Sequence, residues 1–203
     1  MAQLDEISRR QRGVVTRQQA LRAGITPDVL RRRVTSGRWQ RLLPGTYATF
    51  AGRPPPDVLR WAAVLHAGAG AMLCLRSAAE EAGLAEPRPG AVHVLIPEER
   101  RVRQVPGLVV HRSRHASARR HPHRRPPQTR MEETVLDLVV TAPDAAEAMH
   151  WITTACARRL TTPDRIAQAL ARRSRLARRY AVSALLAVAA TGHTTPLPHW
   201  PAA

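Results

Sequence analysis

Arginines and short polar side chains in the stretch 16–41 are of the types that contact nucleic acid. Asp28, Arg31, Arg32 and Thr35 recur at i, i+3, i+4 and i+7, so they fall on one face of any helix formed there. Arginine binds guanine edges and phosphate groups, and threonine hydroxyls contact bases or the backbone. The spacing therefore predicts a helix that presents a DNA-contacting face.

Two helices are expected to position this face. Thr16 and Gln19 have the spacing of a capping box, and Gly24 suits the end of that first helix. Thr26 then caps the second helix, with Pro27 at its first position. The side of the second helix that is expected to pack inward carries Val29, Leu30 and Val34.

A β-hairpin is predicted to follow, because residues 39–43 and 46–50 flank the type II turn sequence Pro44-Gly45. Arg38 and Arg41 would face a DNA backbone from this hairpin. The candidate DNA-binding residues are Thr16, Arg17, Gln18, Thr26, Asp28, Arg31, Arg32, Thr35, Arg38 and Arg41. The alternative is a small packing unit with solvated arginines. The order of caps, turn, polar face and hairpin favours a winged helix-turn-helix.

The composition agrees with a polyanionic partner. The 203 residues carry a net charge of +17, and all 32 basic residues are arginine. GC-biased coding also produces such a composition, but the charge attracts polyanions whatever its origin. The cysteines Cys74 and Cys156 lie in apolar contexts, which predicts buried thiols in a reducing compartment. No signal peptide or apolar run of about 20 residues is visible, so we expect a cytoplasmic protein.

The predicted fold class is α+β. Residues 1–52 form the winged helix-turn-helix, Gly52 to Pro56 a stiff linker, and 57–190 a mixed α/β domain followed by a disordered tail at 191–203. Residues 92–96 and 108–111 are predicted to be a hairpin or neighbouring strands. Ser77 and Glu80 suggest a capping box. The helices expected after that are 131–140, 144–158, 162–171 and 176–190.

Two further basic segments leave their roles open. Residues 100–130 hold ten arginines and no acid, and the part 112–130 is expected to be irregular. Its histidines have spacings that occur in zinc sites, but dense arginine repels a cation, so a solvated or phosphate-contacting loop is favoured. Residues 158–179 hold eight arginines and one aspartate. They form either additional DNA contacts or a solvated face.

A metal-dependent nuclease is the main enzymatic alternative. Its site needs clustered carboxylates. The acids occur as the adjacent pairs Glu80-Glu81, Glu98-Glu99 and Glu132-Glu133, which point apart on helices, while Asp137 stands alone. We therefore expect no enzymatic activity, no metal and no cofactor.

The sequence resembles AbiEi-type antitoxins of type IV toxin–antitoxin systems over most of residues 4–190. The more specific N-terminal matches are GVVTRQQALRAGI at 13–25 and RWQRLLPGTY at 38–47. The others are RSAA at 76–79, GL at 83–84, VHV at 92–94, PGLVVHRS at 106–113 and TVLDL at 134–138.

The resemblance implies a winged helix-turn-helix that binds its own operator and a C-terminal region that antagonises a nucleotidyltransferase toxin. Many relatives look fused to a domain similar to very-short-patch-repair endonucleases. There a His-Ser-x-Leu-Glu motif leads into the nuclease, whereas here Pro198 replaces the acid in the corresponding stretch 193–198. The implication is a form that lacks the nuclease.

The expected function is therefore a sequence-specific DNA-binding autorepressor, with double-stranded DNA and a toxin as partners. One alternative is a protein-interaction module that binds a toxin without specific DNA readout, and another is a nuclease remnant. Helix-turn-helix proteins often bind paired half-sites, which leaves a homodimer open.

Overall fold

The chain has an α+β fold that divides into two compact units. A computed structural model describes residues 2–191 and 199–201. The first unit contains Met1–Leu73 and Pro87–Gln128, and the second contains Cys74–Glu86 and Thr129–Ala203.

The N-terminal part of the first unit is a winged helix-turn-helix, as predicted. Its elements are α1 (Ala2–Arg10), β1 (Val14–Thr16), α2 (Arg17–Arg22), α3 (Pro27–Thr35), β2 (Gln40–Leu43) and β3 (Thr46–Ala48). The three strands form an antiparallel sheet in the order β1-β3-β2. The core under the helices consists of Leu4, Val15, Ala20, Ile25, Leu30 and Trp39. Strand β1 is an addition to the predicted two-stranded hairpin, and it pairs Val14 with Ala48.

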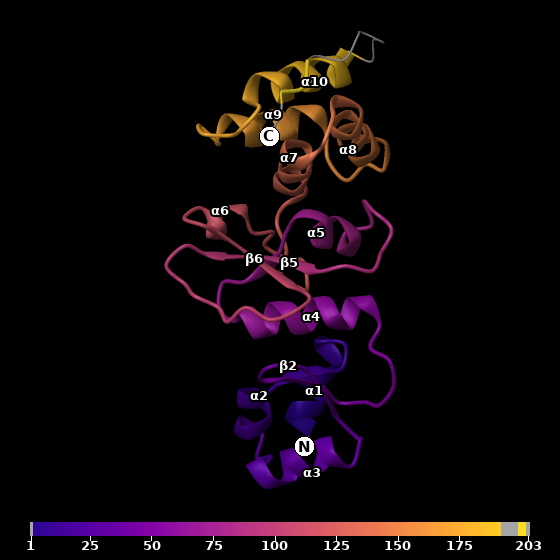
Figure 1. Cartoon of the computed structure of the whole chain (residues 1–203), viewed down its shortest axis with the longest axis vertical. Helices are drawn as coiled ribbons and strands as arrows, with labels where there is room; N and C mark the ends of the chain where they lie inside the picture. Colours follow the sequence, from indigo (N-terminus) through magenta and orange to yellow (C-terminus); the bar gives the residue numbers. More distant parts are fainter. Residues whose placement is uncertain (1, 192–198, 202–203) are drawn as a thin grey trace. The chain divides into compact units, whose positions relative to one another are not determined.

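Helix α4 (Pro56–Ala67) packs against both sheets of the first unit (Figure 1). Its buried Val58, Trp61 and Ala62 meet Val14 of the winged segment in one apolar cluster. Pro55 and Pro56 begin this helix because proline fits the first turn, where its missing N–H has no partner to lose.

The second sheet of this unit contains β4 (Met72–Leu73), β5 (Val92–Pro97) and β6 (Leu108–Ser113). β4 pairs antiparallel with β5, and β5 pairs parallel with β6. The predicted alternative of a β5–β6 hairpin is wrong, because the connection 98–107 carries the chain back to the end of the sheet where β5 began. The short helix α6 (Ala116–Arg119) interrupts the segment that was expected to be irregular.

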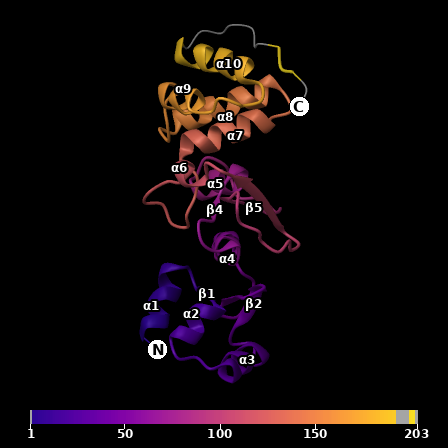
Figure 2. The same cartoon turned by 90° about the vertical axis from the view of Figure 1, so that its left-hand side faces the viewer.

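The second unit is helical. Its elements are α5 (Leu75–Glu81), α7 (Met131–Thr141), α8 (Ala145–Ala157), α9 (Pro163–Ala171) and α10 (Arg179–Thr191), seen together in Figure 2. Leu136, Ile152, Ile166 and Leu185 lie in its core. Thr162 caps α9 as predicted, since its side chain accepts the N–H of Arg165 at 3.3 Å.

Three local predictions in the second unit are wrong. Cys74, not Ser77, is the N-cap of α5, and Ser77 is buried inside that helix. Helix α10 begins at Arg179 and not at 176, because Arg178 takes a positive φ of 56° that ends regular structure before it. Cys156 is only partly buried, although burial does raise the pKa of its thiol.

The segment predicted as a disordered tail is described only at 191 and at 199–201. Residues 192–198, which include the stretch compared with the nuclease-fused relatives, lie outside the described residues, as do 202–203. The Trp200 indole N–H donates to the carbonyl of Ala142 at 3.0 Å, and Trp200 packs against the helical core. Among the described residues, no helix has the length and apolar character needed to cross a bilayer.

Candidate nucleic-acid interface

The start of α2 is fixed by reciprocal hydrogen bonds. Thr16 Oγ1 accepts the N–H of Gln19 at 3.1 Å, and Gln19 Oε1 accepts the N–H of Thr16 at 2.8 Å. Gln11 exchanges two amide hydrogen bonds with Gln19 at 3.0 and 3.1 Å, which ties α1 to this cap. Ile25, buried in the turn, locks α3 against α2. The orientation of α3 is therefore set by residues that are themselves held in place.

Helix α3 separates its two faces as the spacing predicted. Leu30 is 4% exposed and packs in the core, with Val29 and Val34 partly buried against it. The side chains on the outer face are all exposed: Asp28, Arg31, Arg32 and Thr35. Asp28 and Arg31 form an open ion pair at 3.5 Å. In water such a pair contributes little to stability.

Thr16 and Thr26 are the N-cap residues of α2 and α3. Thr16 completes the capping box of α2, and Thr26 accepts the N–H of Val29 at 3.3 Å at the start of α3. Arg17 and Gln18, which follow Thr16, have exposed side chains.

A depression next to the C-terminal end of α3 concentrates positive charge. It is open to solvent, has a volume of about 480 Å³, and is lined by Val29, Arg32, Arg33, Ser36 and Arg38. The Arg33 guanidinium lies over the indole of Trp39, 4.9 Å from the ring centre. That stacking aligns the planar cation. Arg33 is not among the candidate DNA-binding residues of the sequence analysis, so its place in this depression was not predicted. The tryptophan six residues further on was the available signal.

The hairpin β2–β3 forms, but its turn does not project freely. The N–H of Arg17 donates to the carbonyl of Gly45 at 2.8 Å, and His66 Nδ1 of α4 lies 2.9 Å from the carbonyl oxygen of Pro44. Arg41, in the middle of β2, stays exposed, as does Arg38 just before it. The wing is therefore a braced ribbon that presents arginines from its side, not from its tip.

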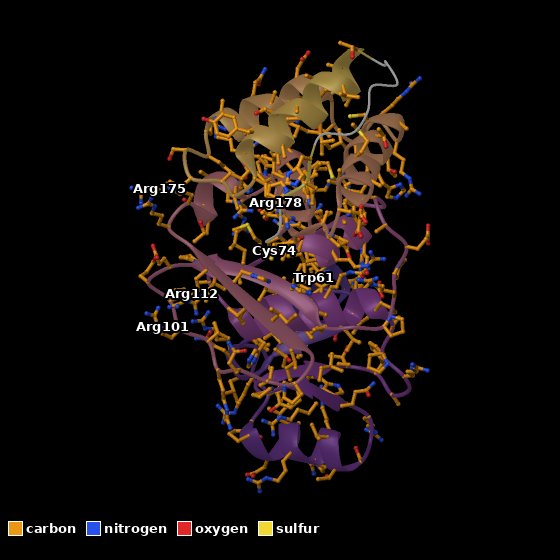
Figure 3. All side chains as sticks on the ribbon, turned by 45° about the horizontal axis from the view of Figure 1, so that its top comes forward. Trp61, Cys74, Arg101, Arg112, Arg175 and Arg178 are labelled. Atoms are coloured by element: carbon orange, nitrogen blue, oxygen red, sulfur yellow. The ribbon has the colours of Figure 1, made fainter. Side chains whose placement is uncertain are left out.

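The basic segment at 100–125 of the first unit is also at the surface. Arg101 and Arg112, labelled in Figure 3, are both exposed and extend outward from it. His93 and His111 stack across β5 and β6, with 3.0 Å between His93 Nδ1 and His111 Nε2. Burial, and secondarily the charge on His111, lowers the pKa of His93. Within the described residues, no three potential ligands come together to hold a metal ion.

The basic segment 158–179 was predicted to form either DNA contacts or a solvated face. Several of its arginines instead make hydrogen bonds within the fold. Arg178 Nη1 donates to the carbonyls of Val140 and Ala142 at 2.9 and 2.6 Å, at the end of α7. Arg179 Nη1 donates to the carbonyls of Leu170 and Arg173 at 2.9 and 2.5 Å, at the end of α9. These guanidinium groups satisfy helix C-termini, where cations are favoured.

Of the acids of α7, Glu132 and Glu133 point to different arginines, as predicted, whereas Asp137 does not stand alone as predicted. Arg173 donates to Glu133 Oε2 at 2.8 Å and to Asp137 Oδ1 at 2.7 Å, and Arg165 forms an ion pair with Glu132. Burial opposes charge on Arg173, but the carboxylates of Asp137 and Glu133 outweigh it and raise the pKa of Arg173. Each of these three carboxylates of α7 is thus paired with an arginine.

Comparisons with known proteins agree with the N-terminal geometry. Residues 2–49 match the family model described as "Transcriptional regulator, AbiEi antitoxin". Among solved structures, the RV2827C protein from Mycobacterium tuberculosis is similar in fold, with a TM-score of 0.54 and 21% sequence identity. The alignment covers 96% of this chain and 82% of that chain. No curated protein matches the sequence.

Proposed function

We propose that this chain is a sequence-specific DNA-binding regulator that represses its own operon as an antitoxin does, because residues 2–49 match the family model described as a transcriptional regulator and AbiEi antitoxin. The observation that carries the proposal is the outer face of α3. Its four polar side chains are exposed on a helix whose opposite side is buried and whose start is capped. A helix-turn-helix places such a face in the major groove.

Within this proposal, Arg31 and Arg32 contact base edges. Each good bidentate contact contributes about 1–3 kcal/mol of discrimination against the wrong base. Asp28 orients Arg31 through their ion pair, and Thr35 contacts the groove from the last turn of α3. Losing both arginines should therefore remove most of the preference for one sequence.

The surrounding cations would bind phosphate groups. Arg38 and Arg33 converge on the depression beside α3, while Arg41 and Arg17 lie on the braced wing and at the start of α2. Phosphate contacts fix the register of a protein on the duplex without reading its sequence. Each phosphate neutralised should change the slope of log affinity against log salt by about −0.9.

The experiment first selects binding sites from a pool of random duplexes with the full chain, and then measures competition in gel shifts. The test variant is Arg31→Ala/Arg32→Ala. A charge-matched control is Arg88→Ala/Arg130→Ala, because both side chains are exposed and lie outside residues 2–49. We expect the test variant to lose selectivity by at least tenfold and the control to keep it.

Two results would contradict the proposal. One is a selection that yields no preferred sequence. The other is an α3 variant that discriminates the selected site from random DNA as well as the unchanged protein does. A flat response of affinity to salt would independently remove the phosphate contacts.

The antitoxin part of the proposal concerns a protein partner, a nucleotidyltransferase-type toxin. It is supported by the antitoxin family model that residues 2–49 match. The test is coexpression with any nucleotidyltransferase encoded beside the gene for this chain. Growth arrest by the neighbour alone, relieved by the chain, is the expected result. Unrelieved arrest would leave a DNA-binding regulator without an antitoxin role.

A further inference from the structure

Helices α9 and α10 of the second unit enclose a groove that no part of the proposed DNA interface uses. Its volume is about 310 Å³, roughly twice the 150 Å³ that holds a benzene ring in a protein interior. The walls are mostly small and apolar, with one carboxylate at an end: Ala167, Leu170, Ala171, Leu186, Ala187 and Asp164. A groove of this kind accepts a side chain that is apolar along its body and polar at its tip.

Tyr180, at the start of α10, has that chemistry and lies exposed. It is 92% exposed, whereas the other large exposed apolar side chains, Leu59 and Val109, are 41% and 36% exposed. Aromatic side chains usually bury about 150–250 Å² of surface, and a tyrosine hydroxyl usually finds a partner when the ring is covered. A ring so far out on a rigid helix is therefore available for an intermolecular contact.

The two ends of the groove differ in charge. Arg179 donates to the carbonyl of Leu170, so the start of α10, with Tyr180, lies at the C-terminal end of α9. Asp164 lies at the opposite end, in the first turn of α9. It is exposed and takes part in no ion pair in the described part of the chain. Arg175 and Arg179 accompany Tyr180, which makes the tyrosine end basic and the far end acidic. Figure 3 shows Arg175 pointing outward.

We propose that a second copy of this chain docks on the groove. A two-fold axis across the groove brings the Tyr180 end of each copy over the Asp164 end of the other. The contact is then the same surface used twice. Each Tyr180 ring enters the partner groove, its O–H donates to the Asp164 carboxylate there, and the neighbouring arginines face that acid.

The net positive charge of both copies opposes this contact over a longer range. Residues 158–179 hold eight arginines and one aspartate. Salt shortens the distance over which this repulsion acts. The screening length is about 30 Å at 0.01 M salt and about 3 Å at 1 M. Ring burial is not weakened by salt. Self-association through the groove should therefore strengthen as salt rises, which is the reverse of the response expected for DNA binding.

The proposed function gives this contact a purpose, since two copies supply two α3 helices for paired half-sites. The biological role given to the dimer rests on the proposed function, but the existence of the dimer does not. Its test uses the full chain free of DNA, so a monomer with intact DNA selectivity would overturn the dimer alone, and a dimer without selectivity would overturn the DNA function alone.

Sedimentation of the full chain over a range of concentrations, at about 50 mM and about 500 mM salt, measures the dimer directly. We expect a monomer–dimer equilibrium that is tighter at the higher salt. Tyr180→Ala should raise the dissociation constant at least tenfold, and Ala187→Glu should do the same by placing a charge in the groove. Leu59→Ala, which removes another exposed apolar side chain, should leave the constant unchanged.

The proposal fails if the chain is monomeric at every concentration and both salts. It also fails if Tyr180→Ala dimerises as well as the unchanged chain. The dimer would then form through a different surface, and the groove would be left for another occupant such as an acidic partner. Thermal unfolding of each variant, at concentrations where the unchanged chain is monomeric, separates loss of contact from loss of fold. Under those conditions Tyr180→Ala should leave the melting temperature unchanged, because the side chain is exposed.

Discussion

Arginines have opposite roles in α3 and in the segment that joins α9 to α10. Arg31 and Arg32 lie on an exposed face, where Arg31 pairs with Asp28. Arg173 and Arg178 turn inward, onto two carboxylates and onto two backbone carbonyls. Figure 3 shows Arg178 within the helical unit. The segment 172–178 holds four arginines and α3 holds three, yet Arg173 and Arg178 of the former are used within the fold.

The difference comes from what the surrounding structure leaves unsatisfied. Helix α7 ends with open carbonyls beside Arg178, and Glu133 on the same helix is buried. A buried carboxylate or carbonyl without a partner is costly, so nearby guanidinium groups are drawn to it. The core below α3 consists of apolar side chains, which offer no carboxylate or carbonyl group for the arginines on its outer face to bind. Charge density in a sequence therefore predicts a binding surface only where the core beneath has no polar groups to satisfy.

The largest expected effect is on Arg173. Arg173→Ala leaves Glu133 and Asp137 without the guanidinium between them, and breaking a buried ion pair on one side costs about 3–5 kcal/mol. Urea unfolding should show a loss of that order. Arg32→Ala, an exposed counterpart in α3, should change the free energy of unfolding by less than about 0.5 kcal/mol. Equal effects of the two substitutions would remove the contrast between the regions.

A smaller effect is expected at the helix caps of the DNA-binding face. Thr26→Ala removes the acceptor for the N–H of Val29, and loss of such a cap costs about 1 kcal/mol. Thr16→Ala should cost a similar amount, because it breaks the capping box with Gln19. Thr35→Ala, near the other end of α3, is the control and should be close to neutral. Thermal unfolding measures all three, and a neutral Thr26→Ala would mean that the cap does not hold α3.

The smallest expected effect concerns the paired histidines of the second sheet. Burial first, and then His111, lowers the pKa of His93 below its ordinary 6.5, so the folded chain binds its proton less readily than the unfolded chain. The stability from this source is present above 6.5 and is lost as the pH falls below it. The free energy of unfolding should thus fall between about pH 7.5 and about pH 5.5, and less so in His93→Gln. His115→Gln, an exposed histidine, should keep the full pH dependence.

The local features of the winged segment were predictable because a few neighbouring residues determine them. The capping box of Thr16 and Gln19, the Thr26 cap and the inward Ile25 follow from hydrogen bonds and burial within one turn. The outer face of α3 follows from helical periodicity alone. These features account for most of the candidate site.

The missed features depend on partners far away in the sequence. Strand β1 is only three residues long, and it is defined by its pairing with β3, whose partner residues come 30 to 34 positions later. The parallel course of β6 depends on a connection that no short motif specifies. Likewise, Asp137 was predicted to stand alone because its partner Arg173 comes 36 residues later. Sequence reasoning could count these charges but could not pair them.

Helix α4 has a practical consequence for anyone who divides this chain into fragments. Val14 and Phe50 rest on Val58 and Trp61, so a protein ended at residue 52 would expose apolar surface that the whole chain covers. Ending it after Ala67 would uncover the side of α4 that faces β5. Binding measured on either fragment would include nonspecific binding to the newly exposed apolar surface, so the intact chain should be used.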